Sequence, residues 1–164
     1  MDDLKFLADG MLGKLTRWLR MLGHDVVYVG SMNDNELILK AKEENRILLT
    51  RDVQLYQRAI TKGAEAFLLE SPNQITNLAQ AAGRFKFPLE INPEISRCPK
   101  CNTKIRRILK TEAAGKVPKK TLVHYDDFWQ CPNCQQVYWR GAHWKKIEPT
   151  LIEAQKTLES KSES

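Results

Sequence analysis

The sequence predicts an α/β domain with a parallel sheet, followed by a small β-rich module built around four cysteines. Two observations support this fold class. In the first half of the chain, short apolar and β-branched runs alternate with longer segments whose apolar residues recur at helical spacing. In the second half, two C-x-x-C pairs stand on either side of a basic, aromatic-rich segment. We expect an α/β domain over 1–87, a linker over 88–97, the cysteine module over 98–146, and a C-terminal helix and tail over 147–164.

Four segments are expected to form strands, and each is followed by a helical pattern. The strands are predicted at 4–8, 25–29, 46–50 and 64–69, and the helices at 11–22, 34–44, 53–62 and 71–85. The last helix is expected to have Ser71 as its N-cap, with Pro72 in the first turn and Gln74 completing a capping box. Strands that alternate with helices in this way form a parallel sheet with right-handed crossovers, so all their C-terminal ends lie at one edge.

Composition indicates a globular protein, because 42% of the 164 residues are hydrophobic and 28% are charged. No apolar run approaches the ~20 residues that span a bilayer, and the N-terminus lacks the pattern of a signal sequence. We therefore expect a cytoplasmic protein without a membrane partner.

The formal charge of +6 comes from the second half of the chain. Residues 1–85 hold equal numbers of basic and acidic side chains, whereas 97–120 contain nine Lys or Arg and one acid, Glu112. Such a segment attracts polyanions such as nucleic acids. The alternative is a charged surface that only keeps the protein soluble.

Three acids follow three different predicted strands. Asp9 comes after the first strand, Asp34 opens the helix after the second, and Asp52 follows the third. Each could be a helix cap, but three carboxylates at one sheet edge repel one another unless a cation joins them. Oxygen ligands of this kind suit Mg²⁺ or Mn²⁺. Asp25 begins a strand, so it belongs to the opposite edge. Glu36 is explained by a capping box with Asn33.

The cysteine pairs Cys98–Cys101 and Cys131–Cys134 have the spacing of a structural zinc site. Four thiolates fill a tetrahedral ion, so this zinc stabilises the fold and has no free position for a substrate. Redox-active pairs are the alternative, but they require a strand-to-helix setting that this segment lacks.

Between the cysteine pairs, strands are expected at 105–109 and 122–125, around a basic loop at 110–121. Aromatic and cationic residues then interleave: Phe128, Trp129, Tyr138, Trp139, Arg140, His143 and Trp144. Such a surface can stack nucleobases and hold phosphates. The alternative is that the aromatics form the core of the small module, which we favour for Phe128 and Trp129.

Five segments of the chain resemble one known family. They are FLADGMLGKL at 6–15, RWLRMLG at 17–23, ILLTRD at 47–52, RCPKCN at 97–102 and YWRGAHW at 138–144. Together they resemble the Mut-seven C-terminal ribonuclease-type domain family from about residue 5 to residue 146. The resemblance implies a three-layer PIN-like nuclease domain with a zinc ribbon attached, and thus a metal-dependent ribonuclease acting on RNA.

The resemblance carries Asp9, Asp34 and Asp52 over as catalytic ligands of Mg²⁺ or Mn²⁺. PIN-type nucleases commonly have a fourth acid, for which this chain offers only Glu36 or Glu70. We expect substrate phosphates to be contacted by Lys14, Arg17, Arg20 and Arg51, and by Arg106, Arg107 and Arg140 of the ribbon.

The expected partner is RNA, with the ribosome or a tRNA as candidates. The main alternative is an RNA- or ribosome-binding module without catalysis. A PIN-type toxin is less favoured, because toxins seldom need such a ribbon.

Overall fold

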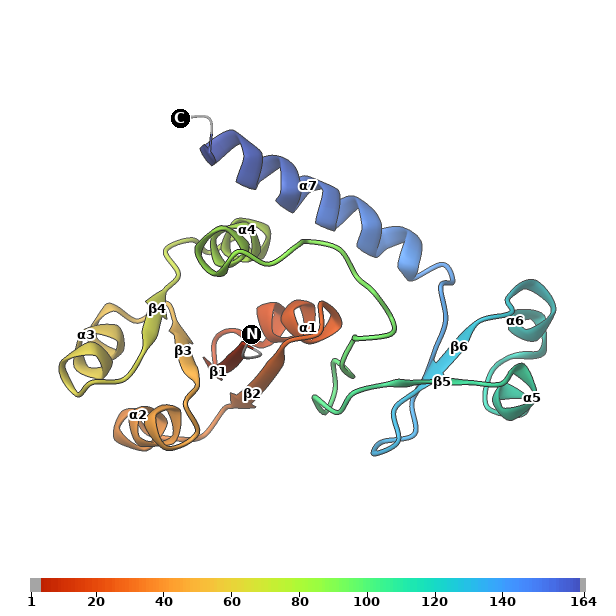
Figure 1. Cartoon of the computed structure of the whole chain (residues 1–164), viewed down its shortest axis with the longest axis horizontal. Coiled ribbons are helices and arrows are strands. Elements are labelled where there is room, and N and C mark those ends of the chain that lie inside the picture. The colour runs from red at the N-terminus through yellow and green to blue at the C-terminus, as the bar shows by residue number, and fades with distance from the viewer. Residues whose placement is uncertain (1–3, 163–164) are drawn as a thin grey trace.

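The computed structural model describes residues 4–162 and confirms the predicted fold class. The first half contains a parallel sheet of β1 (Lys5–Asp9), β2 (Asp25–Val29), β3 (Ile47–Thr50) and β4 (Ala66–Leu68), in the order β2-β1-β3-β4 (Figure 1). The chain moves outward from β1 to β2 and then returns to place β3 on the other side of β1. The C-terminal ends of β1 and β3 therefore lie at the point where the strand order reverses, which is where parallel sheets bind ligands.

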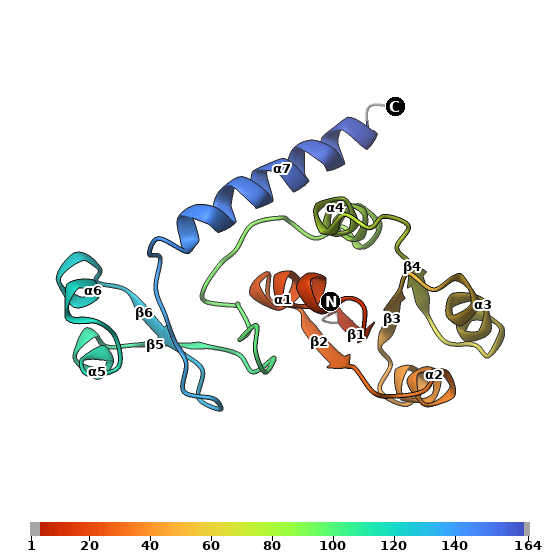
Figure 2. The ribbon, with the colours of Figure 1, turned by 180° about the vertical axis from the view of Figure 1, so that it is seen from behind.

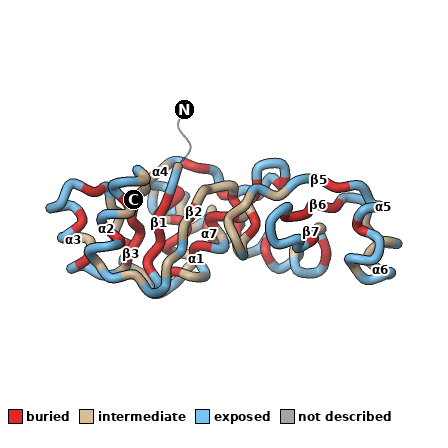
Figure 3. Tube along the Cα trace, turned by 90° about the horizontal axis from the view of Figure 1, so that it is seen from below, coloured by how far each residue is buried: buried red, intermediate tan, exposed pale blue. Residues whose placement is uncertain are grey.

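Helices cover both faces of this sheet, giving three layers. The helices α1 (Gly13–Met21) and α4 (Gln74–Phe85) pack on one face, and α2 (Asp34–Glu43) and α3 (Val53–Thr61) on the other. Alternate residues of a strand point to opposite faces. Phe6 and Ala8 accordingly join the core under α1, while Leu7 joins the core under α2. In Figure 3 the two central strands, β1 and β3, are drawn as buried along most of their length.

Asn and Asp side chains begin three of the helices. Asn33 caps α2 as expected, accepting a hydrogen bond from the backbone N–H of Glu36 at 2.9 Å. The predicted cap of α4 is wrong: the cap is Asn73, which accepts from the N–H groups of Ile75 and Thr76. Asn73 can accept both of these orphan N–H groups, whereas the hydroxyl of Ser71 accepts the N–H of Asn73 itself.

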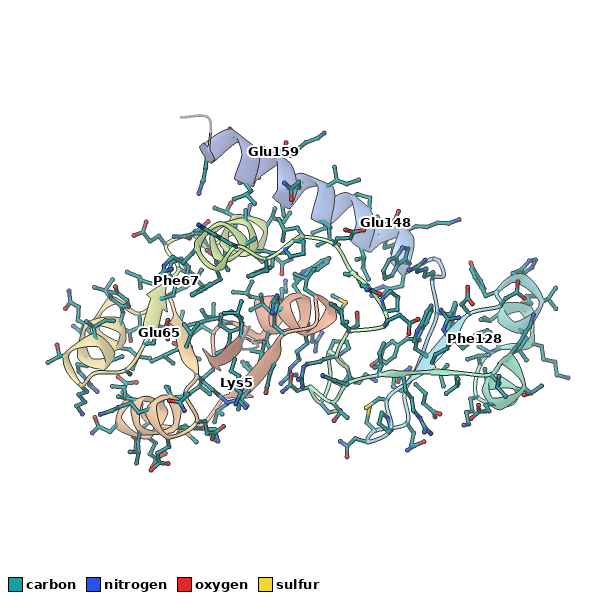
Figure 4. All side chains as sticks on the ribbon, viewed as in Figure 1. Lys5, Glu65, Phe67, Phe128, Glu148 and Glu159 are labelled. Carbon is teal, nitrogen blue, oxygen red and sulfur yellow. The ribbon has the colours of Figure 1, made fainter. Side chains whose placement is uncertain are left out.

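The second half contains an antiparallel sheet, β5-β6-β7, formed by Arg106–Ile108, Phe128–Gln130 and Val137–Tyr138. The predicted strand at 122–125 is wrong, because α6 (Lys119–His124) occupies most of that segment after Pro118, and α5 (Lys110–Ala113) lies in the predicted loop. Phe128 is fully buried between the sheet and these helices (Figure 4). This burial explains why 128–130, and not 122–125, pair with β5.

The C-terminal helix α7 (Trp144–Ser162) begins earlier than predicted and contributes to the first core. It runs from the small sheet back across α4, as the two opposite views show (Figures 1 and 2). Ile147, Leu151 and Ala154 are buried in the same cluster as α1 and α4. Helix α7 therefore ties the two halves of the molecule together. Among the described helices, none has both the length and the apolar composition needed to span a membrane.

Further contacts join the cysteine module to the first domain. The Asn102 side chain accepts the N–H of Val26 at 3.0 Å and donates to Asp25 at 2.7 Å. Asp25 also pairs with Arg46, at 2.9 Å. Gly23 has φ +100°, and a Cβ there would lie 3.0 Å from the carbonyl oxygen of Ile95. A residue without a side chain thus lets the linker approach the end of α1.

Candidate active site and metal centre

Asp9 is a buried carboxylate at the C-terminal end of β1. Its side chain has 8% of its surface exposed, and both oxygens accept hydrogen bonds. The N–H of Met11 donates to Oδ1 at 2.8 Å, and the hydroxyl of Thr50 donates to Oδ2 at 2.7 Å. A carboxylate has about four acceptor positions, so each oxygen keeps capacity for a cation. The burial and these two donors fix the orientation of Asp9.

Thr50 connects Asp9 to Asp52. Thr50 ends β3 beside β1, and its hydroxyl oxygen also accepts the N–H of Asp52 at 3.0 Å. Asp52 is the N-cap of α3, and its Oδ1 accepts the N–H groups of Gln54 at 2.9 Å and Leu55 at 3.3 Å. Both of these hydrogen bonds go to Oδ1, so Oδ2 of Asp52 keeps its acceptor positions for another group. Two of the predicted acids thus belong to one hydrogen-bonded chain across neighbouring strands.

Asp34 lies at the same sheet edge, but its side chain pairs with Arg58 and does not join the hydrogen bonds between Asp9 and Asp52. It is the first residue of α2, and its Oδ2 accepts from Arg58 of α3 at 3.3 Å. Both side chains are nearly half exposed, at 41% and 47%. Within residues 4–162, the three acids do not form a compact group of metal ligands of the kind that the cysteines form. The structure therefore links Asp9 to Asp52 and holds Asp34 in a separate ion pair.

A cavity of about 290 Å³ adjoins this edge, between the N-terminal ends of α1 and α4. Lys14 and Arg51 both line it, and Arg51 directly precedes Asp52. The Nε of Arg51 and the Oε1 of Gln74, which also lines the cavity, are buried without a hydrogen-bond partner among the described residues. Phosphate-binding sites in proteins are commonly formed by cationic side chains and helix N-termini. Arg17, another residue of α1 that is expected to contact substrate phosphates, is exposed.

Arg20, also expected to bind substrate, is buried and donates to backbone carbonyl groups. It has 8% of its surface exposed, and its guanidinium donates to the carbonyl of Val26 from both Nε and Nη2 and to the carbonyl of Pro99 from Nη1. Burial lowers the pKa of Arg20, against the opposing effect of nearby Cys101 and Cys98. Arg20 lies on the buried side of α1, where its hydrogen bonds join α1 and β2 to the cysteine module.

The four cysteines form a compact cluster. Their sulfur atoms all lie within 4.8 Å of one another, and none is in a disulfide. Cys98 and Cys134 are 3.6 Å apart, and Cys101 and Cys131 are 3.4 Å apart. Zn–S bonds of about 2.3 Å place the sulfurs of a tetrahedral site roughly 3.8 Å from one another. The cluster therefore fits a metal ion such as zinc.

The two C-x-x-C segments have the same backbone conformation. In the first, the N–H of Asn102 donates to the carbonyl of Cys98, and in the second, the N–H of Gln135 donates to the carbonyl of Cys131. Asn102 and Gln135 both have positive φ, at 72° and 67°. Two matching turns thus bring the four sulfurs together, as expected for a ribbon-type metal site.

The thiols differ in acidity. Burial raises the pKa of Cys131 to about 12 and raises that of Cys98 as well. For Cys101, burial opposes ionisation, but hydrogen bonds with Thr103, Asn133 and Cys131 together outweigh it and lower the pKa to about 6. Because a metal binds thiolates, it must displace the protons of the buried cysteines.

Two of the three predicted cations of the ribbon, Arg107 and Arg140, lie near Trp129. Arg107 lies over the Trp129 ring at 5.1 Å and pairs with Glu94 and Asp127. Arg140 lies 5.9 Å from the same ring and 5.3 Å from the Trp144 ring. Arg106 is exposed. Phe128 and Trp129 are both buried, as favoured from the sequence.

The comparison with family models decides the classification. A model described as the Mut7-C RNAse domain matches residues 4–151. The chain belongs to this family. No curated protein and no solved structure shows a significant match to the chain. Membership in an RNAse-domain family indicates a nuclease-type function, and the four-cysteine cluster provides a site for a metal.

Sequence reasoning missed two polar residues of this edge, Thr50 and Arg58. Thr50 ends a strand two residues before Asp52, and that spacing was the available signal. Arg58 gives no such signal, because only the packing of α3 beside α2 brings it to Asp34.

Proposed function

We propose that this protein is a metal-dependent ribonuclease that hydrolyses phosphodiester bonds of RNA at the C-terminal edge of its parallel sheet. The observation that carries the proposal is the position of Asp9. A buried carboxylate stands where the strand order reverses, held by Thr50 and joined through it to Asp52. Such an oriented carboxylate at a ligand-binding edge, with acceptor positions left on both oxygens, supports a catalytic role.

The oxygen donors at this edge suit Mg²⁺ or Mn²⁺. Asp9 and Asp52 would hold the ion first, and Asp34 would complete the set when its pair with Arg58 opens. A divalent ion here supplies Lewis-acid polarisation of the phosphodiester and a more acidic bound water. Thr50 orients Asp9, while Lys14 and Arg51 in the adjoining cavity bind the phosphates that flank the scissile bond.

In this proposal the ribbon binds zinc through its four cysteines and contributes positive surface to RNA binding. Arg106, Arg107 and Arg140 lie on it, and the second half of the chain carries the excess positive charge. Phosphate contacts of this kind make affinity depend on salt but not on sequence.

The test is cleavage of labelled single-stranded RNA by the purified full-length protein with added Mg²⁺ or Mn²⁺, or with neither. The expected result is cleavage that requires the ion and falls at least about 100-fold in Asp9→Asn. Zinc content and RNA affinity should remain near wild type in that variant, because the side chain of Asp9 bonds to Met11 and Thr50 and not to residues of the ribbon.

The matched control is Asp127→Asn, which removes one carboxylate from an exposed ion pair on the ribbon. This variant should cleave at nearly the wild-type rate. RNA binding without ion-dependent cleavage would contradict the nuclease assignment. It would support the non-catalytic binding module, which the separate pairing of Asp34 with Arg58 also favours.

A further inference from the structure

A second cavity lies where the cysteine module meets the first domain. It has a volume of about 130 Å³ and is bounded by the linker, the small sheet and the start of α7. Its lining is largely apolar and aromatic and includes Trp129, Trp139, Trp144, Ile91 and Ile105. Three of the four tryptophans of the chain thus surround one cavity. None of the predicted nuclease residues of the sheet edge lines it.

Two buried N–H donors on residues that line this cavity have no partner. Trp129 has 4% of its surface exposed, and its Nε1 makes no hydrogen bond within the described part of the chain. The Nε of Arg97 is likewise buried without an acceptor, although its Nη1 donates to the carbonyl of Asn102. Leaving a buried donor unbonded costs about 1–3 kcal/mol. Because both donors belong to residues that line the cavity, they favour a ligand that brings acceptors.

The size of the cavity and its aromatic walls limit what that ligand can be. A cavity of about 150 Å³ holds one benzene ring. At about 130 Å³ this cavity is close to that size, so it suits a single six-membered ring better than the fused rings of a purine. Unstacked bases of single-stranded RNA bind in this way, stacked on aromatic side chains and hydrogen-bonded at their edges. Uracil and cytosine are single rings, and both carry the carbonyl oxygen O2 as an acceptor.

The surroundings suit a base attached to a strand. A shallower hollow of about 520 Å³ shares Tyr138, Trp139 and His143 with the cavity and extends to Lys120 on α6. Arg140 lines the cavity and stacks on the Trp144 ring. A backbone leaving the cavity along this hollow would pass cationic groups that neutralise its phosphates.

We propose that this cavity binds one pyrimidine base of single-stranded RNA, away from the carboxylates of the sheet edge. The proposal rests on the proposed function only in taking RNA as the substrate class. It adds a base preference that phosphate contacts alone cannot give. Trp129 and Arg97 donate to the base, and Trp139 and Trp144 provide its stacking surfaces.

The test measures binding to the full-length, zinc-containing protein in the Asp9→Asn background, so that cleavage does not interfere. The probes are fluorescein-labelled ten-nucleotide oligomers of uridine, cytidine or adenosine. We expect the two pyrimidine oligomers to bind at least about 10-fold more tightly than the adenosine oligomer. Equal affinity for all three would overturn the proposal, whatever the cleavage assay shows.

Two matched variants test the location. Ile105 lines the cavity, so Ile105→Phe should fill it and reduce pyrimidine binding to the adenosine level. Ile95 is exposed on the linker and does not line the cavity, so Ile95→Phe should retain the preference. If Ile105→Phe folds, binds zinc and keeps the preference, the cavity is not the site.

Trp129→Phe tests the buried donor. It keeps a large ring but removes the unpartnered N–H, so thermal stability should hold while the pyrimidine preference falls about 10-fold. Loss of stability with unchanged preference would show a purely structural role and contradict the proposal.

Titration with uridine 5′-monophosphate distinguishes the source of the base. Saturable, Ile105→Phe-sensitive binding of this nucleotide without an oligomer preference would identify a free-nucleotide site and overturn the assignment to RNA.

Discussion

The acidic edge of the parallel sheet and the cysteine cluster of the ribbon are both candidate metal sites, but they differ in how far the fold assembles them. The four sulfurs lie within 4.8 Å of one another, brought together by two turns of the same conformation. At the sheet edge, Asp9 and Asp52 are linked through Thr50, whereas Asp34 is paired with Arg58. Burial raises the pKa of Cys98 and Cys131, so these thiols can lie close together as neutral groups without a metal, whereas carboxylates are already charged and repel one another.

This difference matches two uses of a metal. A structural site has all its ligands from the protein and is closed, whereas a catalytic site keeps open positions for water and substrate. At the sheet edge the three acids are not all joined in one group, so such an arrangement leaves coordination positions of a bound ion open.

The largest effect is expected from removing a cysteine ligand. Cys98→Ser should abolish stoichiometric zinc binding and unfold the ribbon, because structural zinc supplies an apparent ~10–16 kcal/mol in small modules. Elemental analysis and hydrogen exchange of residues 98–140 measure this. Asp9→Asn serves as the control and should keep its zinc. A folded, zinc-containing Cys98→Ser protein would show that the cluster is not a closed metal site.

The next effect is expected at Thr50, which positions the acids without binding substrate. Thr50→Val removes the hydroxyl that donates to Asp9 and accepts from Asp52, and should lower kcat about 10–100-fold with little change in RNA affinity. Thr50→Ser keeps the hydroxyl and should restore most of the rate. Equal rates for Val and Ser would rule out this positioning role.

Asp25 lies where the two regions are joined, and its contribution to the stability of the protein depends on pH. Burial raises the pKa of Asp25, but hydrogen bonds from Arg46 and Asn102 outweigh this and hold the pKa below its ordinary value. The stabilisation is therefore present above the unfolded pKa of about 3.9 and is lost as pH falls through the lower folded pKa. Asp25→Asn should cost about 2 kcal/mol at pH 7.

Urea unfolding at pH 7 and at progressively more acidic pH measures this effect. The difference between Asp25→Asn and wild type should shrink as the pH falls below about 3.9. A difference that stays constant with pH would mean that the charge of Asp25 does not contribute.

The smallest effect is expected at Arg58, whose exposed ion pair with Asp34 contributes at most about 1 kcal/mol. Arg58→Gln frees Asp34 and should tighten Mn²⁺ binding by up to about fivefold. Isothermal titration measures the affinity. Arg84→Gln, on α4, makes the same change of charge away from Asp34. If both variants bind Mn²⁺ equally, then the ion pair does not limit the site.

The sequence by itself determined the elements that depend on local pattern. Apolar periodicity located the four parallel strands and their helices, and strand-to-helix alternation fixed the common edge of Asp9 and Asp52. The spacing of the cysteines predicted their cluster, because each C-x-x-C turn is local and only two such turns had to meet.

Only the tertiary structure decided which partners these residues take. Arg20 and Arg17 are both cations on one helix, yet packing buries the first against Val26 and Pro99 and leaves the second exposed. Most of the segment expected as a strand at 122–125 lies in α6. Phe128, which is fully buried, lies in the strand that pairs with β5 instead. The ion pair of Asp34 and the cavity around Trp129 likewise come from surfaces distant in sequence, which no local pattern encodes.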